Sequence, residues 1–576
     1  MTTSIGEAPG KRGSVRSYIL VAIAALLCLL PFSGKAFHVD DTLFLYAARQ
    51  ITQHPFDPYG FEVNWYRSPQ AMWMQTMNPP LACYALAVAG KLVGWSERPL
   101  HLVFFLPALV VILGTYYLAR RFTDSPLVAV AATLLTPVFL VSASTLMCDT
   151  LMLAIWMVAL ILWIEGIDRD APLLLTAAAV LIGLCALTKY FGISLVGLLL
   201  AYTWVRRRRL GGWAWYLAIP ILILAAYQQW TWSLDYGHMF GGAVRFARSY
   251  RRDTHVSLLA DGLVDLSFLG GCVLPGLFFA PLLWSRKRIV IGAAFSAVAG
   301  LVIGRGWVNL GQSGVLRDYQ EHLVLVGIEA GFFIAGGLSI LGLAIADLWK
   351  RRDADSVLLA AWVLGTFYFA GFVNWSNNGR SILPLVPAAG ILLARRLDGL
   401  RIPSAKRFSM PVAALLVLSA AMSLWVTWGD EANANSAREA ANRIYEKTRN
   451  QAGTVWFEGH WGFQYYMESI GAHVVDIDAP EMRPGDAIAI SEGNARFFQV
   501  RPRFIVEDDV IQVALPGGLA TMQSKMGAAF YSSDDGPLPF AIGPVPDERY
   551  DLLRLSVPEN WAQALVPPKP RPPFRR

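Results

Sequence analysis

Residues 18–47 read YILVAIAALLCLLPFSGKAFHVDDTLFLYA, and this stretch decides the fold. Its first half is apolar and, with its flanks, approaches the length that a helix needs to cross a hydrocarbon core of about 30 Å. Basic residues precede it, as in a signal peptide, but no convincing small-residue cleavage site follows. We therefore predict a retained membrane helix over 18–34, with an acidic pair, Asp40 and Asp41, just beyond its end.

The rest of the chain extends this pattern. Hydrophobic residues make up 55% of the 576 residues and charged residues 16%, which is far from the balance of a soluble globular protein. The net charge is +7, but most basic residues occur in short clusters between apolar stretches. Such clusters are typical of membrane topology signals, so we expect no nucleic-acid partner.

Loops rich in Lys and Arg tend to stay in the cytoplasm, which fixes the direction of each span. Counting Pro80 to Trp95 as a crossing would place Arg120 and Arg121 outside, so we predict a juxtamembrane or re-entrant helix there. All the basic clusters then lie inside, the C terminus lies outside, and about thirteen spans are predicted: 18–34, 100–119, 126–145, 147–165, 171–188, 190–204, 212–232, 262–284, 288–304, 321–348, 356–375, 381–396 and 410–428.

Beyond residue 428 the composition becomes that of a soluble domain. Helical spacing over Ala432–Asn450 is followed by strand-like segments at Thr454–Phe457 and His473–Ile477, which favours a small α/β domain. The predicted organisation is a cytoplasmic segment at 1–17, a transmembrane region at 18–428 with an outer loop at 35–99, an outer α/β domain at 429–566 and a Pro- and basic-rich tail at 567–576.

This topology gathers ionisable residues from distant segments at the outer ends of spans. Asp40 and Asp41 follow the first span, whereas Asp149, Lys189 and Arg380 lie at later outer turns. Charged groups at membrane edges are costly and usually functional. A carboxylate beside cations suits the transfer of a sugar from a lipid phosphate, in which a base takes the acceptor proton and cations stabilise the departing phosphate.

The motifs also resemble a known family, the C-type membrane glycosyltransferases, and in particular the group of protein O-mannosyltransferases and lipid A aminoarabinose transferases. Asp40 matches the catalytic Asp that opens the family's first outer loop, and Asp41 stands in place of its Glu. The further similarities are Asn78-Pro79-Pro80-Leu81, Met147-Cys148-Asp149-Thr150-Leu151, Leu187-Thr188-Lys189-Tyr190, and Asn374-Trp375 to Arg380 followed by Leu383-Pro384 and Pro387.

The resemblance implies a fold and an inverting transfer from a polyprenyl-phosphate-linked sugar to a protein, lipid or glycan. The fold class is an α-helical polytopic membrane protein with a small C-terminal α/β domain. Asp40 would be the general base and Asp149 would help to hold the acceptor. Lys189, Arg380, Arg245 and Arg248 are candidates to bind the donor phosphate, and Asp41, Tyr46 and Asn78 to position acceptor or donor.

Two departures from the family bear on metal binding. Asn78 stands where relatives often have a phosphate-contacting Lys, and Met77 stands where the aminoarabinose transferases have a Glu that helps to bind a metal. No ligand motif replaces them, so we predict no metal site and no certain cofactor, although a divalent metal remains open.

Other readings of the sequence predict different behaviour. A transporter or flippase would place charges in the middle of spans, and a non-catalytic scaffold would tolerate Asp40→Asn. An oligosaccharyl or glycan-polymer transferase would use the same fold with another acceptor. The lack of an evident organelle signal favours a bacterial inner membrane, with the site outside the cytoplasm, although enzymes of the endoplasmic reticulum share this topology.

Overall fold

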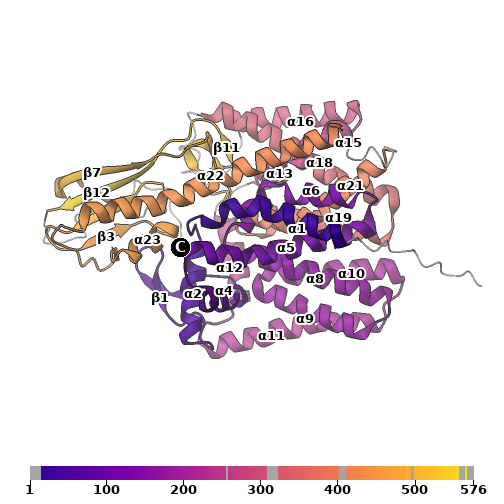
Figure 1. Ribbon diagram of the computed structural model, residues 1–576, viewed down its shortest axis with the longest axis horizontal. Helices are drawn as coiled ribbons and strands as arrows, with labels where there is room; N and C mark the ends of the chain where they lie inside the picture. Colours follow the sequence, from indigo (N-terminus) through magenta and orange to yellow (C-terminus); the bar gives the residue numbers. More distant parts are fainter. Residues whose placement is uncertain are drawn as a thin grey trace, which may run out of the picture.

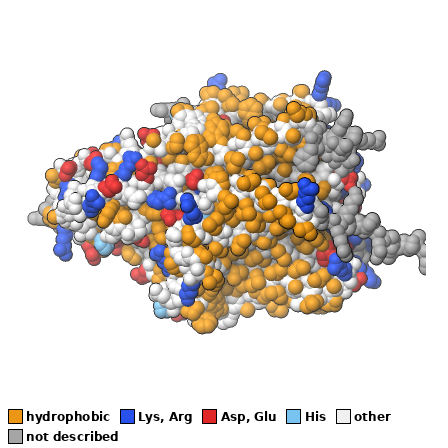
Figure 2. Space-filling view, in the orientation of Figure 1, with side chains coloured by type: hydrophobic (Ala, Val, Ile, Leu, Met, Phe, Trp, Pro, Cys, Tyr) orange, Lys and Arg blue, Asp and Glu red, His pale blue; other side chains and the backbone are white. Residues whose placement is uncertain are grey.

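The computed structural model describes residues 15–253, 257–307, 322–400, 410–493, 498–556 and 565–566. The predicted tail at 567–576 and most of the N-terminal segment lie outside these residues. The described chain is mostly helical, with a mixed sheet at one end of the helical bundle (Figure 1). Hydrophobic side chains cover the visible face of the bundle, whereas charged side chains gather over the sheet (Figure 2).

Within the described residues, seven helices are long and apolar enough to cross a membrane. An eighth span results if α6 (Pro126–Leu134) and α7 (Pro137–Ala143), which are bent by 64°, are counted together. The protein is therefore a multi-pass membrane protein. The seven helices are α1 (Val15–Leu29, continued to Gly34), α5 (Glu97–Phe122), α8 (Cys148–Asp168), α16 (Arg286–Gly304), α18 (Leu323–Arg351), α19 (Ala354–Tyr368, continued to Val373) and α22 (Met410–Thr448).

The remaining predicted spans fall on shorter helices, which explains why the count is below thirteen. These are α9 (Pro172–Thr188), α10 (Ser194–Arg207), α11 (Ala218–Ser233), α13 (Leu258–Cys272) and α21 (Val386–Asp398). Proline is one cause, because it lacks the backbone donor that continues a helix. Pro275 follows α13, and Pro384 lies in the short turn before α21. The segment predicted to be juxtamembrane forms α4 (Leu81–Val93), a 13-residue apolar helix.

Glycines bring two of the long helices into backbone contact. A Cβ atom added at Gly300 of α16 would lie 2.4 Å from the carbonyl oxygen of Gly327 in α18. Gly304 and Gly331 continue the contact at a spacing of four residues in each helix. Small residues at this spacing let membrane helices approach closely, so van der Waals contacts between backbones hold the pair together.

The C-terminal region is built on α22. This 39-residue helix passes through position 428, where the sequence predicted the end of the transmembrane region, and continues beside the sheet (Figure 1). The sheet has the order β4-β3-β5-β12-β7, in which β3 pairs in parallel with β4 and β5, and β12 pairs antiparallel with β5 and β7. Its strands are β3 (Val455–Glu458), β4 (His473–Val474), β5 (Ala487–Ser491), β7 (Ile505–Val513) and β12 (Glu548–Leu555).

The predicted strands at 454–457 and 473–477 thus fall on β3 and β4. The helix predicted over 432–450 is the C-terminal end of α22 and not a separate element. One short helix, α23 (Trp461–Ser469), packs against α22 and against α2 (Asp41–Gln53). The C-terminal region is therefore held directly against the segment that follows the first span.

Glu548 makes the stability of this region depend on pH. Burial, with a contribution from Glu492, raises the pKa of Glu548 from 4.5 to about 7. The folded chain therefore binds this proton more tightly than the unfolded chain, so the stabilisation is complete below pH 4.5 and is lost as pH rises to about 7. Glu548→Gln should remove this part of the pH dependence of the free energy of unfolding, which is on the order of 3 kcal/mol. Thermal unfolding in detergent at pH 5 and pH 8 tests this, and an unchanged difference between the two midpoints would contradict it.

Candidate active site

The turn before α2 places the two acidic residues, Asp40 and Asp41, in different surroundings. Val39 has φ of 47°, a conformation that a β-branched residue rarely adopts. Asp41 is fully buried: its Oδ2 accepts from the backbone N–H of His38 at 3.0 Å and its Oδ1 accepts from that of Leu146 at 2.8 Å. Burial raises the pKa of Asp41 to about 7. Asp41 thus ties the turn to the loop before α8, whereas the side chain of Asp40 remains 29% exposed.

Four residues that the sequence singled out form one chain of alternating charge. Arg380 Nη1 lies 3.0 Å from Asp40 Oδ2 and 4.0 Å from Asp149 Oδ2. Lys189 Nζ lies 2.5 Å from Asp149 Oδ1. Two carboxylates and two cations thus alternate, so each charge has an opposite neighbour. We call this group, Asp40, Arg380, Asp149 and Lys189, the ion chain.

Each member of the ion chain comes from a different part of the fold. Asp40 precedes α2, Asp149 lies in the first turn of α8, Lys189 follows α9, and Arg380 lies in α20 (Gly379–Ile382). An acidic residue in the first turn of a helix is stabilised by the backbone N–H groups at that end. Within the ion chain, the most exposed side chains are those of Asp40, at 29%, and Lys189, at 22%.

This arrangement offers the chemistry of group transfer. A partly exposed carboxylate can accept a proton from a hydroxyl or amine. A guanidinium beside it can donate to phosphate oxygens, and an ammonium group adds a second positive charge. Arg380 Nε is buried and has no hydrogen-bond partner among the described residues, so its donors are not all used within the ion chain.

The other predicted site residues do not join the ion chain. The hydroxyl of Tyr46 donates to Glu468 of α23, and the backbone carbonyl of Asn78 accepts from the hydroxyl of Tyr59 at 2.9 Å. Arg245 and Arg248 are exposed on α12 (Met239–Asp253). A neighbour on the same helix makes the contacts instead: Arg251 donates to the carbonyl of Asn374 and pairs with Asp261 at 3.0 Å.

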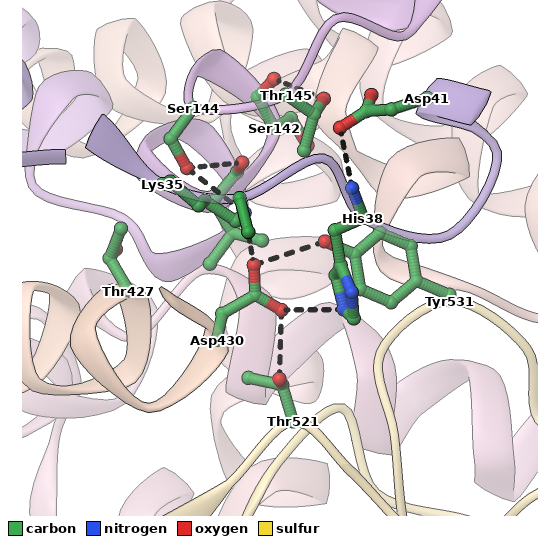
Figure 3. Close-up of polar contacts among 12 residues, drawn as sticks. Lys35, His38, Asp41, Ser142, Ser144, Thr145, Thr427, Asp430, Thr521 and Tyr531 are labelled. Atoms are coloured by element: carbon green, nitrogen blue, oxygen red, sulfur yellow. Dashed lines mark hydrogen bonds and ion pairs between the residues drawn. The ribbon is translucent and has the colours of Figure 1, made fainter. Parts of the chain in front are cut away.

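A buried polar cluster beneath the turn was not found from the sequence. Lys35 Nζ lies 2.5 Å from Asp430 Oδ2 in α22, and both side chains are fully buried. Figure 3 shows Asp430 between Lys35, His38 and two C-terminal side chains, Thr521 and Tyr531. Their hydroxyls donate to Asp430 at 2.8 and 3.1 Å. A lysine just past the first span was the available signal, but its partner lies 395 residues away.

This ion pair should matter for stability. Asp430→Ala leaves Lys35 buried without its counter-charge, and breaking such a pair costs about 3–5 kcal/mol. We expect a clearly lower unfolding midpoint in detergent. The exposed pair of Lys447 with Asp509 is the matched control, because Lys447→Ala should cost at most about 1 kcal/mol. Equal shifts in the two variants would show that the buried pair is not special.

No group of three or more His, Cys, Asp or Glu side chains in the described part of the chain is arranged to hold a metal ion. The ion chain itself contains two carboxylates, and a cation already neighbours each of them. Its residues therefore suit the binding of an anion better than the binding of a divalent metal.

Comparison with known proteins bears on this site. Residues 77–232 match the model of a family described as dolichyl-phosphate-mannose-protein mannosyltransferase. The matched segment includes Asp149 and Lys189, whereas Asp40 and Arg380 lie outside it. The match confirms the resemblance that the motifs indicated. The description of that family names a dolichyl-phosphate-linked sugar as the donor and a protein as the acceptor.

Solved structures of low sequence identity are also similar. The oligosaccharyltransferase of Archaeoglobus fulgidus in the apo form shares 15% identity at a TM-score of 0.46, over 80% of this chain and 64% of that protein. ArnT from Cupriavidus metallidurans shares 15% identity in the apo state, at a TM-score of 0.41 over 83% of this chain and 93% of ArnT. The structure of ArnT bound to undecaprenyl phosphate shares 16% identity at a TM-score of 0.42, over 83% of this chain and 94% of ArnT. A search of curated protein sequences finds no match.

Proposed function

We propose that the protein is an inverting glycosyltransferase that moves a sugar from a polyprenyl phosphate to a hydroxyl or amine of a protein, lipid or glycan. The observation that carries this proposal is the contact of Asp40 with Arg380, which puts a partly exposed base beside a phosphate-binding cation. The description of the matched family, which names a prenyl-phosphate sugar, supports the donor class. We also propose the C-type glycosyltransferase arrangement for the membrane region, with the shorter helices contributing to it.

The reaction balances with these residues alone. Asp40 takes the proton from the acceptor as its oxygen or nitrogen bonds to the anomeric carbon. The bond from that carbon to the phosphate oxygen breaks, and the prenyl phosphate leaves with the electron pair. Arg380 and Lys189 stabilise the charge that develops on the phosphate. Attack from one face in a single step inverts the anomeric centre, in contrast to retaining enzymes that form a covalent intermediate on a second carboxylate.

The proposed orientation places the ion chain on the outer side of a bacterial inner membrane. The basic clusters predicted to lie in the cytoplasm include Arg206 to Arg209, which form the end of α10 and the two residues after it. Asp40 and the C-terminal region would then share the outer side, and we propose the boundaries 1–17, 18–428, 429–566 and 567–576 for the parts of the chain. Cysteine accessibility mapping at Asp235 and at Arg208 tests the orientation. Labelling of Asp235→Cys from the cytoplasm would contradict it.

The function is tested by offering purified protein a panel of polyprenyl monophosphate sugars. Mass spectrometry of glycans and lipids from cells with and without the gene identifies the acceptor to be supplied. We expect a glycosylated acceptor whose anomeric configuration, determined by NMR, is opposite to that of the donor. Retention of configuration would reject the single-base mechanism. The absence of transfer from every donor, in protein that remains folded, would reject the function.

A further inference from the structure

We propose that residues Phe530–Ser533 of the C-terminal region form part of the catalytic centre and that Tyr531 is the positioning residue of Arg380. The proposal rests on the proposed function, in which Arg380 holds the donor phosphate. It assigns to the C-terminal region a direct part in donor binding. Three independent sets of contacts support it, and each joins the segment at 530–533 to the ion chain or to the turn before α2.

Backbone hydrogen bonds fasten the residues just before Arg380 to the segment at 530–533. The N–H of Gly379 donates to the carbonyl of Phe530 at 2.8 Å, and the N–H of Ser533 donates to the carbonyl of Asn377 at 2.8 Å. The N–H of Asn377 in turn donates to the Ser533 hydroxyl at 3.1 Å. The approach at Gly379 is close, since an added Cβ would lie 2.7 Å from the Phe530 ring. These hydrogen bonds to the C-terminal segment therefore fix the position of the backbone that carries Arg380.

Tyr531 then orients the side chain of Arg380. The Arg380 Cζ atom lies over the Tyr531 ring, 5.6 Å from its centroid, within the range of a cation–π interaction. The ring is almost fully buried. Arg380 Nη1 also lies 3.0 Å from Asp40 Oδ2. The guanidinium thus contacts both a neutral aromatic face and a carboxylate, and the aromatic face adds no charge that would compete with a phosphate.

The buried cluster keeps the Tyr531 ring in place. Its hydroxyl donates to Asp430 Oδ2 at 3.1 Å, and Lys35 neutralises that carboxylate. The ring also meets the His38 ring edge to face, with centroids 5.2 Å apart. Because His38 and Lys35 belong to the turn that carries Asp40, one fixed ring links the base and the phosphate-binding cation. A residue that served the fold of the C-terminal region alone would not need either contact.

Binding of undecaprenyl phosphate to the full-length protein in detergent tests the proposal through a double-mutant cycle. Tyr531→Leu removes the ring and should weaken binding roughly tenfold, as expected for loss of a largely desolvated cation–π contact. Tyr531→Phe keeps the ring and its contact with His38 but loses the hydrogen bond to Asp430, so its loss of affinity should be smaller than that of Tyr531→Leu. In an Arg380→Ala background, Tyr531→Leu should change the affinity less than about twofold, because its effect acts through Arg380.

A matched control is Tyr465→Leu. Tyr465 also lies beneath an arginine, with Arg49 Cζ 5.5 Å from the ring centroid, but it lies outside the ion chain. It should leave lipid-phosphate affinity unchanged. Equal losses from Tyr531→Leu with and without Arg380, or wild-type affinity in Tyr531→Leu, would overturn the positioning role. Because binding is measured without transfer, wild-type protein that binds the lipid phosphate and transfers no sugar would reject the proposed function while the cycle still decides the role of Tyr531.

Discussion

Replacement of Asp40 by asparagine is expected to lower turnover at least about a hundredfold, the usual loss when a general base is removed. The amide has nearly the same shape as the carboxylate and still offers an oxygen to Arg380, but it cannot take the acceptor proton. The contact at 3.0 Å can therefore persist while the chemistry fails. Initial rates with saturating donor and acceptor measure the effect, because the loss should appear in kcat.

The matched control for this variant is Asp235→Asn. Asp235 is an exposed aspartate with φ of 60°, which asparagine also adopts readily, so this substitution should preserve both structure and rate. Its turnover should remain within about twofold of wild type, as for surface changes away from a site. Near-normal turnover in a folded Asp40→Asn protein would remove Asp40 from the mechanism and would favour a scaffold.

Arg380→Ala should act mainly on the donor. The substitution removes the cation that lies beside both Asp40 and Asp149, and Lys189 alone remains to balance two carboxylates. Loss of one group that stabilises developing charge typically costs about 10²–10³ in rate. We expect a fall of this size in kcat/KM for the donor, together with a higher donor concentration at half-maximal rate. Arg380→Lys should recover part of it, since an ammonium group keeps the charge without the two-pronged geometry.

Donor titrations with the acceptor held constant measure this effect. Arg443→Ala is a suitable control, because Arg443 is an exposed arginine on α22 whose partners, Glu439 and the carbonyl of Gln512, lie outside the ion chain. Its removal should leave donor dependence unchanged. If the rate of Arg380→Ala depends on donor concentration as the wild-type rate does, Arg380 does not bind the donor phosphate. Lys189 would then be the remaining candidate.

The sequence predicted that the four members of the ion chain lie on one side of the membrane, because two kinds of information agreed. Motif positions singled out Asp40, Asp149, Lys189 and Arg380, and the distribution of basic residues placed all four on one side of the membrane. The structure shows them in contact. The same reasoning could not decide whether exposed residues such as Arg245 belong to the site. An arginine on a surface helix looks the same in sequence whether it faces a ligand or water.

The buried cluster and the positioning segment were not predictable by the same means. Asp430 lies beyond the last apolar stretch, and Tyr531 lies in a region whose composition suggested an ordinary soluble domain. Their importance arises from contacts with Lys35 and Arg380, which are distant in sequence. Local pattern carries no information about such pairing, and spacing rules apply within one helix or strand.

That the last predicted span and the helix predicted over 432–450 form one continuous helix was not predicted, for a different reason. Hydropathy falls after Trp428, but residues 432–448 are rich in Ala, Glu, Arg and Lys, which favour helix in water as well. Polarity reports the surroundings of a helix and not its length. For this reason α22 continues to Thr448 without interruption.

That continuity constrains how the chain can change. At a rise of about 1.5 Å per residue, α22 is a rod of roughly 58 Å, and each added residue turns everything beyond it by about 100°. Asp430 sits partway along this rod, where it must point at Lys35. A one-residue insertion near residue 420 would swing that carboxylate to another side, so this helix tolerates substitution far better than a change in its number of residues.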